Sequence, residues 1–304
     1  MRRAAMPAAE PIRFFHRYAG RVETEAVYGE GWLRWTYGTL PGRLALHAVA
    51  KRAWFSRWYG RRMDRPASAR KIAPFIARYG LDPAEFADPP ESFRSFNEFF
   101  YRRLKPAARP LHPDPRAVVF PADGRHLAVP DVDRAAGFFV KGQRLDLRRL
   151  LGADDLAAAF TGGTSVLSRL CPVDYHRFHF SVAGRAGKPR LINGPLFSVS
   201  PIALRRNLAI LWENRRWLTL LETPALGRVA MLEIGATNVG SAEHTFAEGA
   251  VERGQEKGFF RFGGSAVLTL FEPGRVRLAD DLREQSAQHR ELYAHVGDGM
   301  AWVA

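Results

Sequence analysis

The chain has 304 residues, of which 46% are hydrophobic and 25% are charged, a composition typical of a globular protein that buries a substantial core. No apolar run approaches the ~18 residues of a transmembrane helix, and we expect neither such a helix nor a secretory signal. The single cysteine, Cys171, excludes an intramolecular disulfide, and we interpret it as a small buried residue.

The net charge of +14 is concentrated near the N-terminus. Residues 1–80 contain 16 Lys and Arg but only five Asp and Glu, a net charge of +11. Four of the seven tryptophans lie in the same stretch: Trp32, Trp35, Trp54 and Trp58. Basic residues with interfacial aromatics are typical of proteins that contact anionic membranes. A helical cap with a solvated basic face and a nucleic-acid patch are the alternatives, but the tryptophans favour a membrane, so we predict no nucleic-acid partner.

Residues 12–80 show aromatic and basic residues at three- and four-residue spacing, which predicts helices broken by glycine and proline. A short helix over residues 71–79 ends at Gly80, and the proline-rich connector 81–90 leads to a helix over 93–103. We therefore predict two domains, a helical membrane-association segment at 1–85 and a catalytic domain at 86–304.

From residue 118 onward the pattern changes to short apolar or alternating runs separated by glycine and proline, which predicts a strand-rich body. The predicted strands are 118–120, 137–140, 165–170, 177–182, 218–222, 228–234, 258–262 and 267–271. A Leu- and Ala-rich stretch over 148–160 predicts a helix. The predicted fold class is therefore α+β, with a β-rich body and flanking helices.

Three distant segments carry residues that suit nucleophilic chemistry. Ser265 follows two glycines between predicted strands, Asp123 lies in Pro-Ala-Asp-Gly, and His176 and His179 lie in Asp-Tyr-His-Arg-Phe-His. A Ser–His–Asp relay is recognised by geometry and not by spacing. Alone, the aspartate is also explained as a turn residue and His179 as a hydrogen-bonded strand residue. The two histidines lack clear third and fourth ligands, so we predict no metal site.

Six segments, in this order, resemble the phosphatidylserine decarboxylase family. They are Ser95-Phe96-Asn97-Glu98-Phe99-Phe100 with Arg102-Arg103-Leu104, Pro121-Ala122-Asp123-Gly124, Lys141-Gly142 with Leu150-Leu151-Gly152, Asp174 to His179, Ile234 to Ser241, and Gly254 to Gly258 with Gly264-Ser265. Three departures from the family pattern occur. Ala266 stands where the family usually has Thr, Ser181 where it usually has Pro, and Asn214-Arg215-Arg216 where it often has Asn-Glu-Arg.

The resemblance implies a self-processing proenzyme with a barrel-sandwich-like body. Ser265 would attack the carbonyl of Gly264 and split the chain into residues 1–264 and 265–304, which would stay associated. Position 265 would then carry a covalent pyruvoyl cofactor. In this family pattern His179, held by Asp123, activates the serine, and His176 later protonates the substrate carbon.

Decarboxylation of an amino acid needs an electron sink that ordinary side chains do not provide. The resemblance implies that the pyruvoyl group provides it through a Schiff base, converting phosphatidylserine to phosphatidylethanolamine and CO₂. We expect a peripheral membrane protein on the cytoplasmic face of the cell membrane, compatible with a homodimer. The alternatives are a pyruvoyl-dependent decarboxylase of a soluble amino acid and an unprocessed membrane-binding relative, for which Ala266 is the best support.

Overall fold

The computed structural model describes residues 11–26, 29–46, 48, 53–132, 145–236, 242–263 and 265–304. Gly264, the predicted strand 137–140, and the motif residues 141–142 and 237–241 lie outside the described residues. So does the side chain of Trp54. The rest of the predicted site lies within them.

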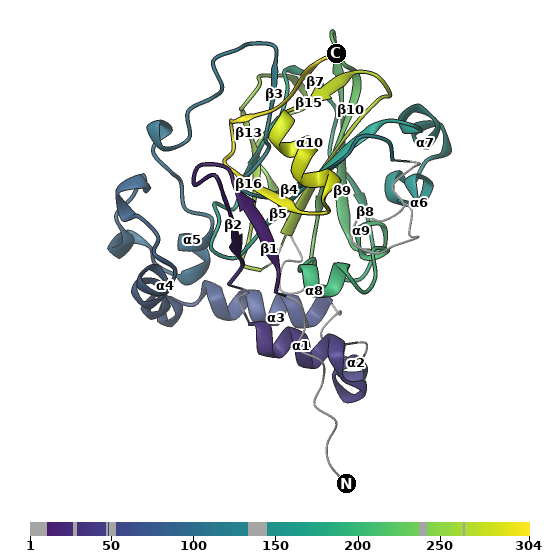
Figure 1. The fold of residues 1–304 in the computed structure, drawn as a ribbon. Helices are drawn as coiled ribbons and strands as arrows, with labels where there is room; N and C mark the ends of the chain where they lie inside the picture. Colours follow the sequence, from purple (N-terminus) through teal and green to yellow (C-terminus); the bar gives the residue numbers. More distant parts are fainter. Residues whose placement is uncertain are drawn as a thin grey trace.

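A large mixed sheet forms the centre of the molecule (Figure 1). Its strands are β1 (Arg13–His16), β2 (Arg21–Thr24), β4 (Gly124–Val129), β5 (Thr164–Leu170), β7 (Gly184–Ala186), β8 (Arg190–Ile192), β9 (Arg216–Thr223), β10 (Gly227–Ile234), β12 (Gly249–Val251), β14 (Ser265–Phe271) and β16 (Glu291–Ala294). Among the described residues these 11 strands follow the order β12-β7-β9-β10-β14-β5-β4-β16-β1-β2, with β8 paired to β9. The predicted cleavage serine therefore begins a central strand.

Two smaller sheets accompany the large one. The described residues form one from β6 (Arg177–His179), β11 (Ala242–His244) and β13 (Glu256–Phe260), in the order β11-β13-β6. The other contains β3 (Ala117–Val119), β15 (Val276–Leu278) and β17 (Gly299–Val303), in the order β15-β17-β3. The first of these small sheets carries the predicted catalytic histidine segment.

The helices surround the sheets. They are α1 (Glu30–Gly38), α2 (Leu40–Ala45), α3 (Ala53–Asp64), α4 (Ile72–Tyr79), α5 (Phe96–Phe100), α6 (Leu147–Leu151), α7 (Asp154–Phe160), α8 (Pro201–Leu204), α9 (Ile210–Glu213) and α10 (Asp280–Ala287), with short 3₁₀ turns at Pro66–Lys71, Pro83–Glu85, Pro90–Ser92 and Pro106–Ala108. In Figure 1, α1, α2 and α3 lie together at the lower end of the molecule, beside α8. No helix in the described part of the chain is long and apolar enough to cross a membrane.

The central strands separate two hydrophobic cores. Along β14, Ala266, Leu268 and Leu270 belong to one core, whereas Val267 and Phe271 belong to the other. Successive side chains of a strand point to opposite faces, so a strand covered on both faces reads as a continuous apolar run. This is why the run over 267–271 predicted a strand correctly.

The α+β class is confirmed, and the barrel-sandwich description stays a prediction. The runs at 165–170, 218–222, 228–234 and 267–271 lie in β5, β9, β10 and β14 as expected, and the helix that ends at Gly80 is also confirmed. The predicted helix over 148–160 is two helices, because the chain turns at Gly152 with φ of 61°. The predicted helix over 93–103 is shorter, reduced to α5.

The expectation of helix from residue 12 onward is wrong for its first part. Residues 13–24 form the β1–β2 hairpin, and β1 pairs in parallel with β16, near the other end of the chain. Phe14 is buried there and its ring lies 6.1 Å from that of Tyr293. The hairpin forms because a distant strand accepts it, which local spacing does not show.

Candidate functional site

Ser265 is fully buried at the first position of β14, where it pairs in register with Leu170 of β5. Two residues earlier, Gly263 has a φ of 141°, which is readily available only to glycine. Strand alternation places Ser265 on the same face as Val267, the face whose core also contains Phe178 of the histidine-bearing sheet. Ala266 points to the opposite core. The departure from the family pattern at position 266 therefore lies on the far side of the strand from the histidines.

A tight turn after β5 returns the chain to Ser265. The backbone N–H of Asp174 donates to the carbonyl oxygen of Cys171 at 2.9 Å. The Asp174 carboxylate in turn accepts from the N–H of Cys171 and from Arg125, both at 2.6 Å. Cys171 is buried, as predicted. This bonded turn fixes the backbone immediately before His176.

The ring of His176 lies against Ser265. Its Nε2 is 2.9 Å from the carbonyl oxygen of Cys171, an acceptor only, so Nε2 carries the proton and Nδ1 has a free lone pair. Nδ1 faces the Oγ of Ser265 at 3.5 Å. The ring is fully buried and stacks on Phe100 at a centroid distance of 3.8 Å. Burial, reinforced by the positive charge of Arg102, lowers the pKa of His176 to about 3.

His179 lies on β6, three residues further along. Its backbone N–H donates to the carbonyl oxygen of Pro121 at 2.7 Å, which ties this strand to the segment that carries Asp123. Its ring Nδ1 is buried and has no hydrogen-bond partner among the described residues. Burial lowers the pKa of His179 to about 4, while the charges of Glu256 and Asp123 act in the opposite direction. The imidazole is therefore neutral at pH 7, with a nitrogen free to act.

Asp123 is buried directly before β4. Its carboxylate accepts from the Nε of Arg109 at 2.8 Å and from the backbone N–H of Val296 at 2.9 Å. The following Gly124 is required by packing, because a Cβ there would lie 2.5 Å from the carbonyl oxygen of Arg169 on the neighbouring strand. The Pro-Ala-Asp-Gly motif thus supplies a glycine that lets β4 lie close to β5 and an aspartate that is buried as a charged group.

The structure brings His176 into contact with Ser265, and it places Asp123 close enough to His179 to influence its pKa. It shows no hydrogen bond between that aspartate and either histidine among the described residues. Two neighbours were missed by sequence reasoning: Arg109, which pairs with Asp123, and Phe100, which supports the ring of His176. Phe100 lay within a recognised motif, whereas no pattern distinguished Arg109. No group of three or more metal-ligating side chains occurs in the described part of the chain.

Known proteins resemble this chain over nearly its whole length. A sequence model of the family described as phosphatidylserine decarboxylase matches residues 96–295. The protein from Chlamydia muridarum named phosphatidylserine decarboxylase proenzyme is 43% identical over 293 residues, 96% of this chain and 97% of the relative. Proteins of the same name from Fusobacterium nucleatum and Desulfitobacterium hafniense are 40% and 37% identical, covering 95% and 94% of this chain and 97% of each relative. The chain therefore belongs to the phosphatidylserine decarboxylase family.

Proposed function

We propose that this protein is a phosphatidylserine decarboxylase proenzyme that cuts itself between Gly264 and Ser265. The observation that carries the proposal is the buried Oγ of Ser265, 3.5 Å from the Nδ1 of a neutral His176, at the junction where the family pattern places the cut. A serine hydroxyl is a weak nucleophile until a neighbouring base takes its proton, and both imidazoles are free to accept one.

Self-cleavage needs only groups of the chain and water. A histidine takes the Oγ proton, Oγ bonds to the carbonyl carbon of Gly264, and the peptide C–N bond breaks to leave an ester and a free amine. Loss of the Cα proton of Ser265 then breaks its Cβ–O bond, which releases a carboxylate on Gly264 and leaves dehydroalanine. Water converts this residue to a pyruvoyl group and ammonia. Atoms and charges balance without a metal or an oxidant.

We assign the first proton transfer to His179 and the later protonation of substrate to His176. The carboxylates of Glu256 and Asp123 stabilise a positive charge on His179, whereas Arg102 opposes one on His176. The imidazole of His179 is therefore the better base, and the imidazole of His176, once protonated, is the stronger acid. A reversed assignment has one observation in its favour, the 3.5 Å approach of His176 to Ser265.

The residues around position 265 suit a small carbonyl group. The pyruvoyl group would supply the electron sink for decarboxylation, and it would be held covalently at the start of β14. The ring of Phe100 covers His176, and Phe262 packs on Phe100 at a centroid distance of 4.9 Å, so this side of the site is buried. The hydrogen bond from the Nε2 of His176 to Cys171 keeps its other nitrogen directed toward the reacting position.

The two fragments should remain one folded body. Residues 265–304 contribute β14, which lies between β10 and β5, and β16, which lies between β4 and β1. Separating the fragments would break the hydrogen bonds on both edges of two sheet strands. We therefore expect association after cleavage.

Intact-mass measurement of the purified protein tests the proposal directly. Under denaturing conditions we expect two chains, residues 1–264 and 265–304, with the smaller one lighter by one ammonia than simple hydrolysis would give. The processed protein should release CO₂ from phosphatidylserine and not from free serine. A single chain after prolonged incubation would contradict self-processing.

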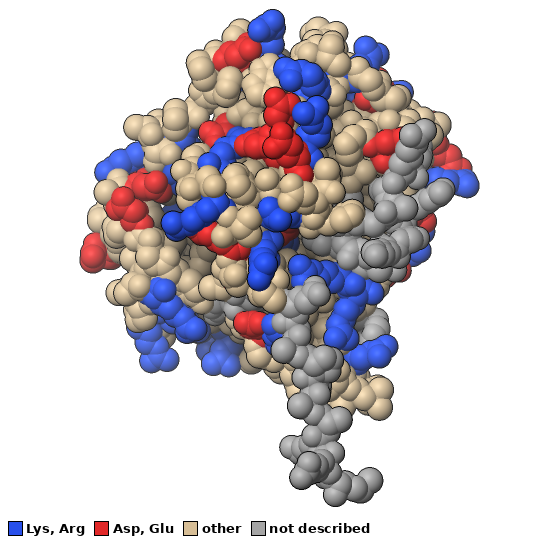
Figure 2. Space-filling view, viewed as in Figure 1, with Lys and Arg blue, Asp and Glu red and all other residues tan. Residues whose placement is uncertain are grey.

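We further propose that α1 to α3 dock on an anionic membrane, which makes the protein peripheral, and that the cytoplasmic face is where it docks. The support is a set of large apolar side chains that stand exposed on these helices: Trp32, Trp35, Leu40, Leu44 and Trp58. In Figure 2 blue side chains of Lys and Arg predominate over red ones toward the lower end of the molecule, where these helices lie. Exposed apolar residues beside cations match the interface of an anionic bilayer.

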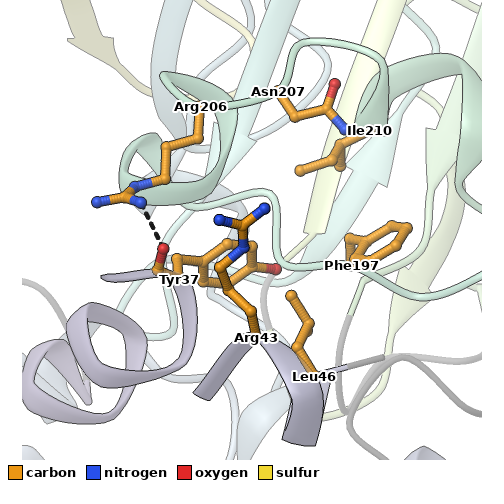
Figure 3. Close-up of a pocket in the computed structure, with 7 residues that line it drawn as sticks. All are labelled: Tyr37, Arg43, Leu46, Phe197, Arg206, Asn207 and Ile210. Atoms are coloured by element: carbon orange, nitrogen blue, oxygen red, sulfur yellow. Dashed lines mark hydrogen bonds between the residues drawn. The ribbon is translucent and has the colours of Figure 1, made fainter. Parts of the chain in front are cut away.

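A cavity of about 390 Å³ lies behind this face, between α1–α2 and the segment that contains α8 and α9 (Figure 3). Arg43 points across it, Arg206 stands at its edge, and Leu46, Phe197 and Ile210 supply an apolar wall. The second arginine is anchored by a hydrogen bond to the carbonyl oxygen of Tyr37. Cations at the mouth of an apolar cavity suit the interfacial part of an anionic lipid, which supports this orientation on the membrane.

The docking proposal predicts that Leu44→Glu weakens binding to anionic vesicles by about tenfold, because a Leu side chain left in water forfeits at least ~1.5 kcal/mol of burial. Leu191→Glu, at an exposed leucine on β8, is the matched control and should bind normally. Co-sedimentation at increasing salt measures the effect, and binding of the unsubstituted protein should fall as charges are screened. Equal binding to neutral and anionic vesicles at every salt concentration would contradict the electrostatic part.

A further inference from the structure

Arg102 is a buried cation whose role the cleavage chemistry does not explain. It lies two residues after α5, and only 4% of it is exposed. Its guanidinium is held between the rings of Phe86 and Phe99, with 4.8 Å from Cζ to each ring centroid. The two rings contact the faces of the planar guanidinium and so fix the orientation of its plane. Its N–H groups point outward within that plane, so they still need hydrogen-bond acceptors.

The edge of the Arg102 guanidinium lacks acceptors. Among the described residues, its buried Nε and Nη1 have no hydrogen-bond partner and its guanidinium forms no ion pair. Burial lowers the pKa of Arg102 to about 10, so the group still carries its charge at pH 7. Leaving buried donors and a buried charge unpaired is costly, and proteins rarely retain such a group without a ligand for it.

Arg102 lines a cavity of about 400 Å³ that also reaches Asp123 and Tyr175. Two other arginines of this cavity already form ion pairs with carboxylates of the chain. Arg109 pairs with Asp123 at 2.8 Å, and Arg125 pairs with Asp174 at 2.6 Å. The cavity wall also carries Glu23, Asp82 and Glu85, of which Glu23 pairs with Arg21 and Glu85 with Arg109. Arg102 is thus an unpaired cation in the wall of a half-open, polar cavity.

The cavity adjoins the reacting residues. Its wall includes Val173, Asp174 and Tyr175, the turn that leads directly into His176. The positive charge of Arg102 is close enough to this histidine to affect its pKa. Ser265 faces the same histidine, so His176 lies between the reacting position and the charge of Arg102 that acts on it.

We propose that this cavity is a binding site for a phosphate-type oxyanion, with Arg102 as its free donor. A guanidinium presents paired N–H groups that match two oxygens of a phosphate. The leaving carboxylate is the poorer candidate, because holding it would stabilise the ground state of a decarboxylation. If the oxyanion is the phosphodiester of the substrate headgroup, the inference rests on the proposed function, and if it is free phosphate it does not.

Binding can be measured without any turnover. In the uncut Ser265→Ala protein, calorimetric titration with glycerophosphoserine and with inorganic phosphate should both give saturable binding. Arg102→Gln should weaken it by about 10–100-fold, the loss expected for a charged hydrogen-bonded pair. Arg103→Gln removes the next arginine, which is exposed, and should bind as before. Tighter binding of glycerophosphoserine assigns the site to the headgroup, and tighter binding of inorganic phosphate assigns it to the free ion.

Kinetics on the processed enzyme give the second readout. With a short-chain phosphatidylserine dispersed as monomers, Arg102→Gln should raise KM by about 10–100-fold and change kcat little, and Arg102→Lys should recover part of the loss. The Arg102→Lys variant also guards against misfolding, because it retains the charge and a methylene stem. Unchanged titrations with both probes in a folded Arg102→Gln protein would overturn the proposal. A protein with Ser265 intact that stays uncut and still binds phosphate would overturn only the proposed function.

Discussion

Ser265→Ala is expected to leave the chain in one piece and to abolish CO₂ release, because no other group can supply the oxygen that becomes the ester. The substitution removes one buried hydroxyl whose polar partner among the described residues is His176, at 3.5 Å, so folding should be retained. Denaturing electrophoresis and intact mass measure the cut, and thermal unfolding checks the fold. Cleavage of this variant at the same bond would exclude Ser265 as the nucleophile.

Substitution of each histidine should affect a different reaction, self-cleavage for His179 and decarboxylation of substrate for His176. His179→Ala should slow cleavage by about 10²–10⁴-fold, the usual contribution of a positioned base, and Asp123→Asn should act in the same direction by removing the charge that favours imidazolium. His176→Ala should still be cut and carry the pyruvoyl group, but it should release CO₂ about 10²–10⁴-fold more slowly. His289→Ala, at an exposed histidine, is the control and should behave as the unsubstituted protein.

Pairing a gel with a CO₂-release assay distinguishes the two assignments. An uncut His176→Ala protein, together with a His179→Ala protein that is cut and inactive, would reverse the roles and would make the 3.5 Å contact with Ser265 the decisive geometry. If both variants were cut and active, neither histidine would have the role that the family pattern assigns. Arg109 must be considered when Asp123→Asn is interpreted, because that substitution leaves its guanidinium with a weaker partner.

The sequence predicted the central strands well because they are buried on both faces. β5, β9, β10 and β14 read as apolar runs, and such runs have few alternatives to a buried strand. The β1–β2 hairpin was missed because its stability comes from β16, far away in the sequence. Strand β4 was missed for a different reason: buried Arg125 and His126 interrupt its apolar pattern, and their partners, Asp174 and Ser168, lie more than 40 residues away in the sequence.

The reacting residues were identifiable from motifs, but their arrangement was not. The tautomer of His176 depends on the carbonyl of Cys171, and the orientation of Ser265 depends on the register of β14 against β5. Neither is local information. On one regular strand, residues three apart such as His176 and His179 would point to opposite faces. The structure resolves this difficulty because β6 begins at Arg177, so His176 belongs to the preceding turn.

A buried ion pair joins the sheet that carries the serine to the sheet that carries the histidines. Lys257 of β13 and Glu233 of β10 are both fully buried, with 2.6 Å from Nζ to Oε1, and His244 lies 3.0 Å from the other oxygen of this carboxylate. Burial alone would raise the pKa of Glu233, but Lys257 and His244 outweigh it and lower the pKa. Because β13 pairs with β6 and β10 pairs with β14, the pair connects the immediate neighbours of the two reacting segments.

Glu233→Gln should therefore destabilise the uncut Ser265→Ala protein by about 3–5 kcal/mol, because it leaves the buried ammonium of Lys257 without a counter-charge. Lys257→Met should cost less, since His244 still donates to the carboxylate and an unpaired glutamate can take up a proton. The double variant should recover much of the loss, since removing both charges removes the desolvation penalty with the attraction. Urea unfolding measures all three, and Asp154→Ala, which breaks an exposed ion pair with Arg148, should change stability by less than ~1 kcal/mol. Additive losses in the double variant would show that the two side chains act independently. The ion pair would then not stabilise the packing of the β11-β13-β6 sheet against the large sheet that contains β14.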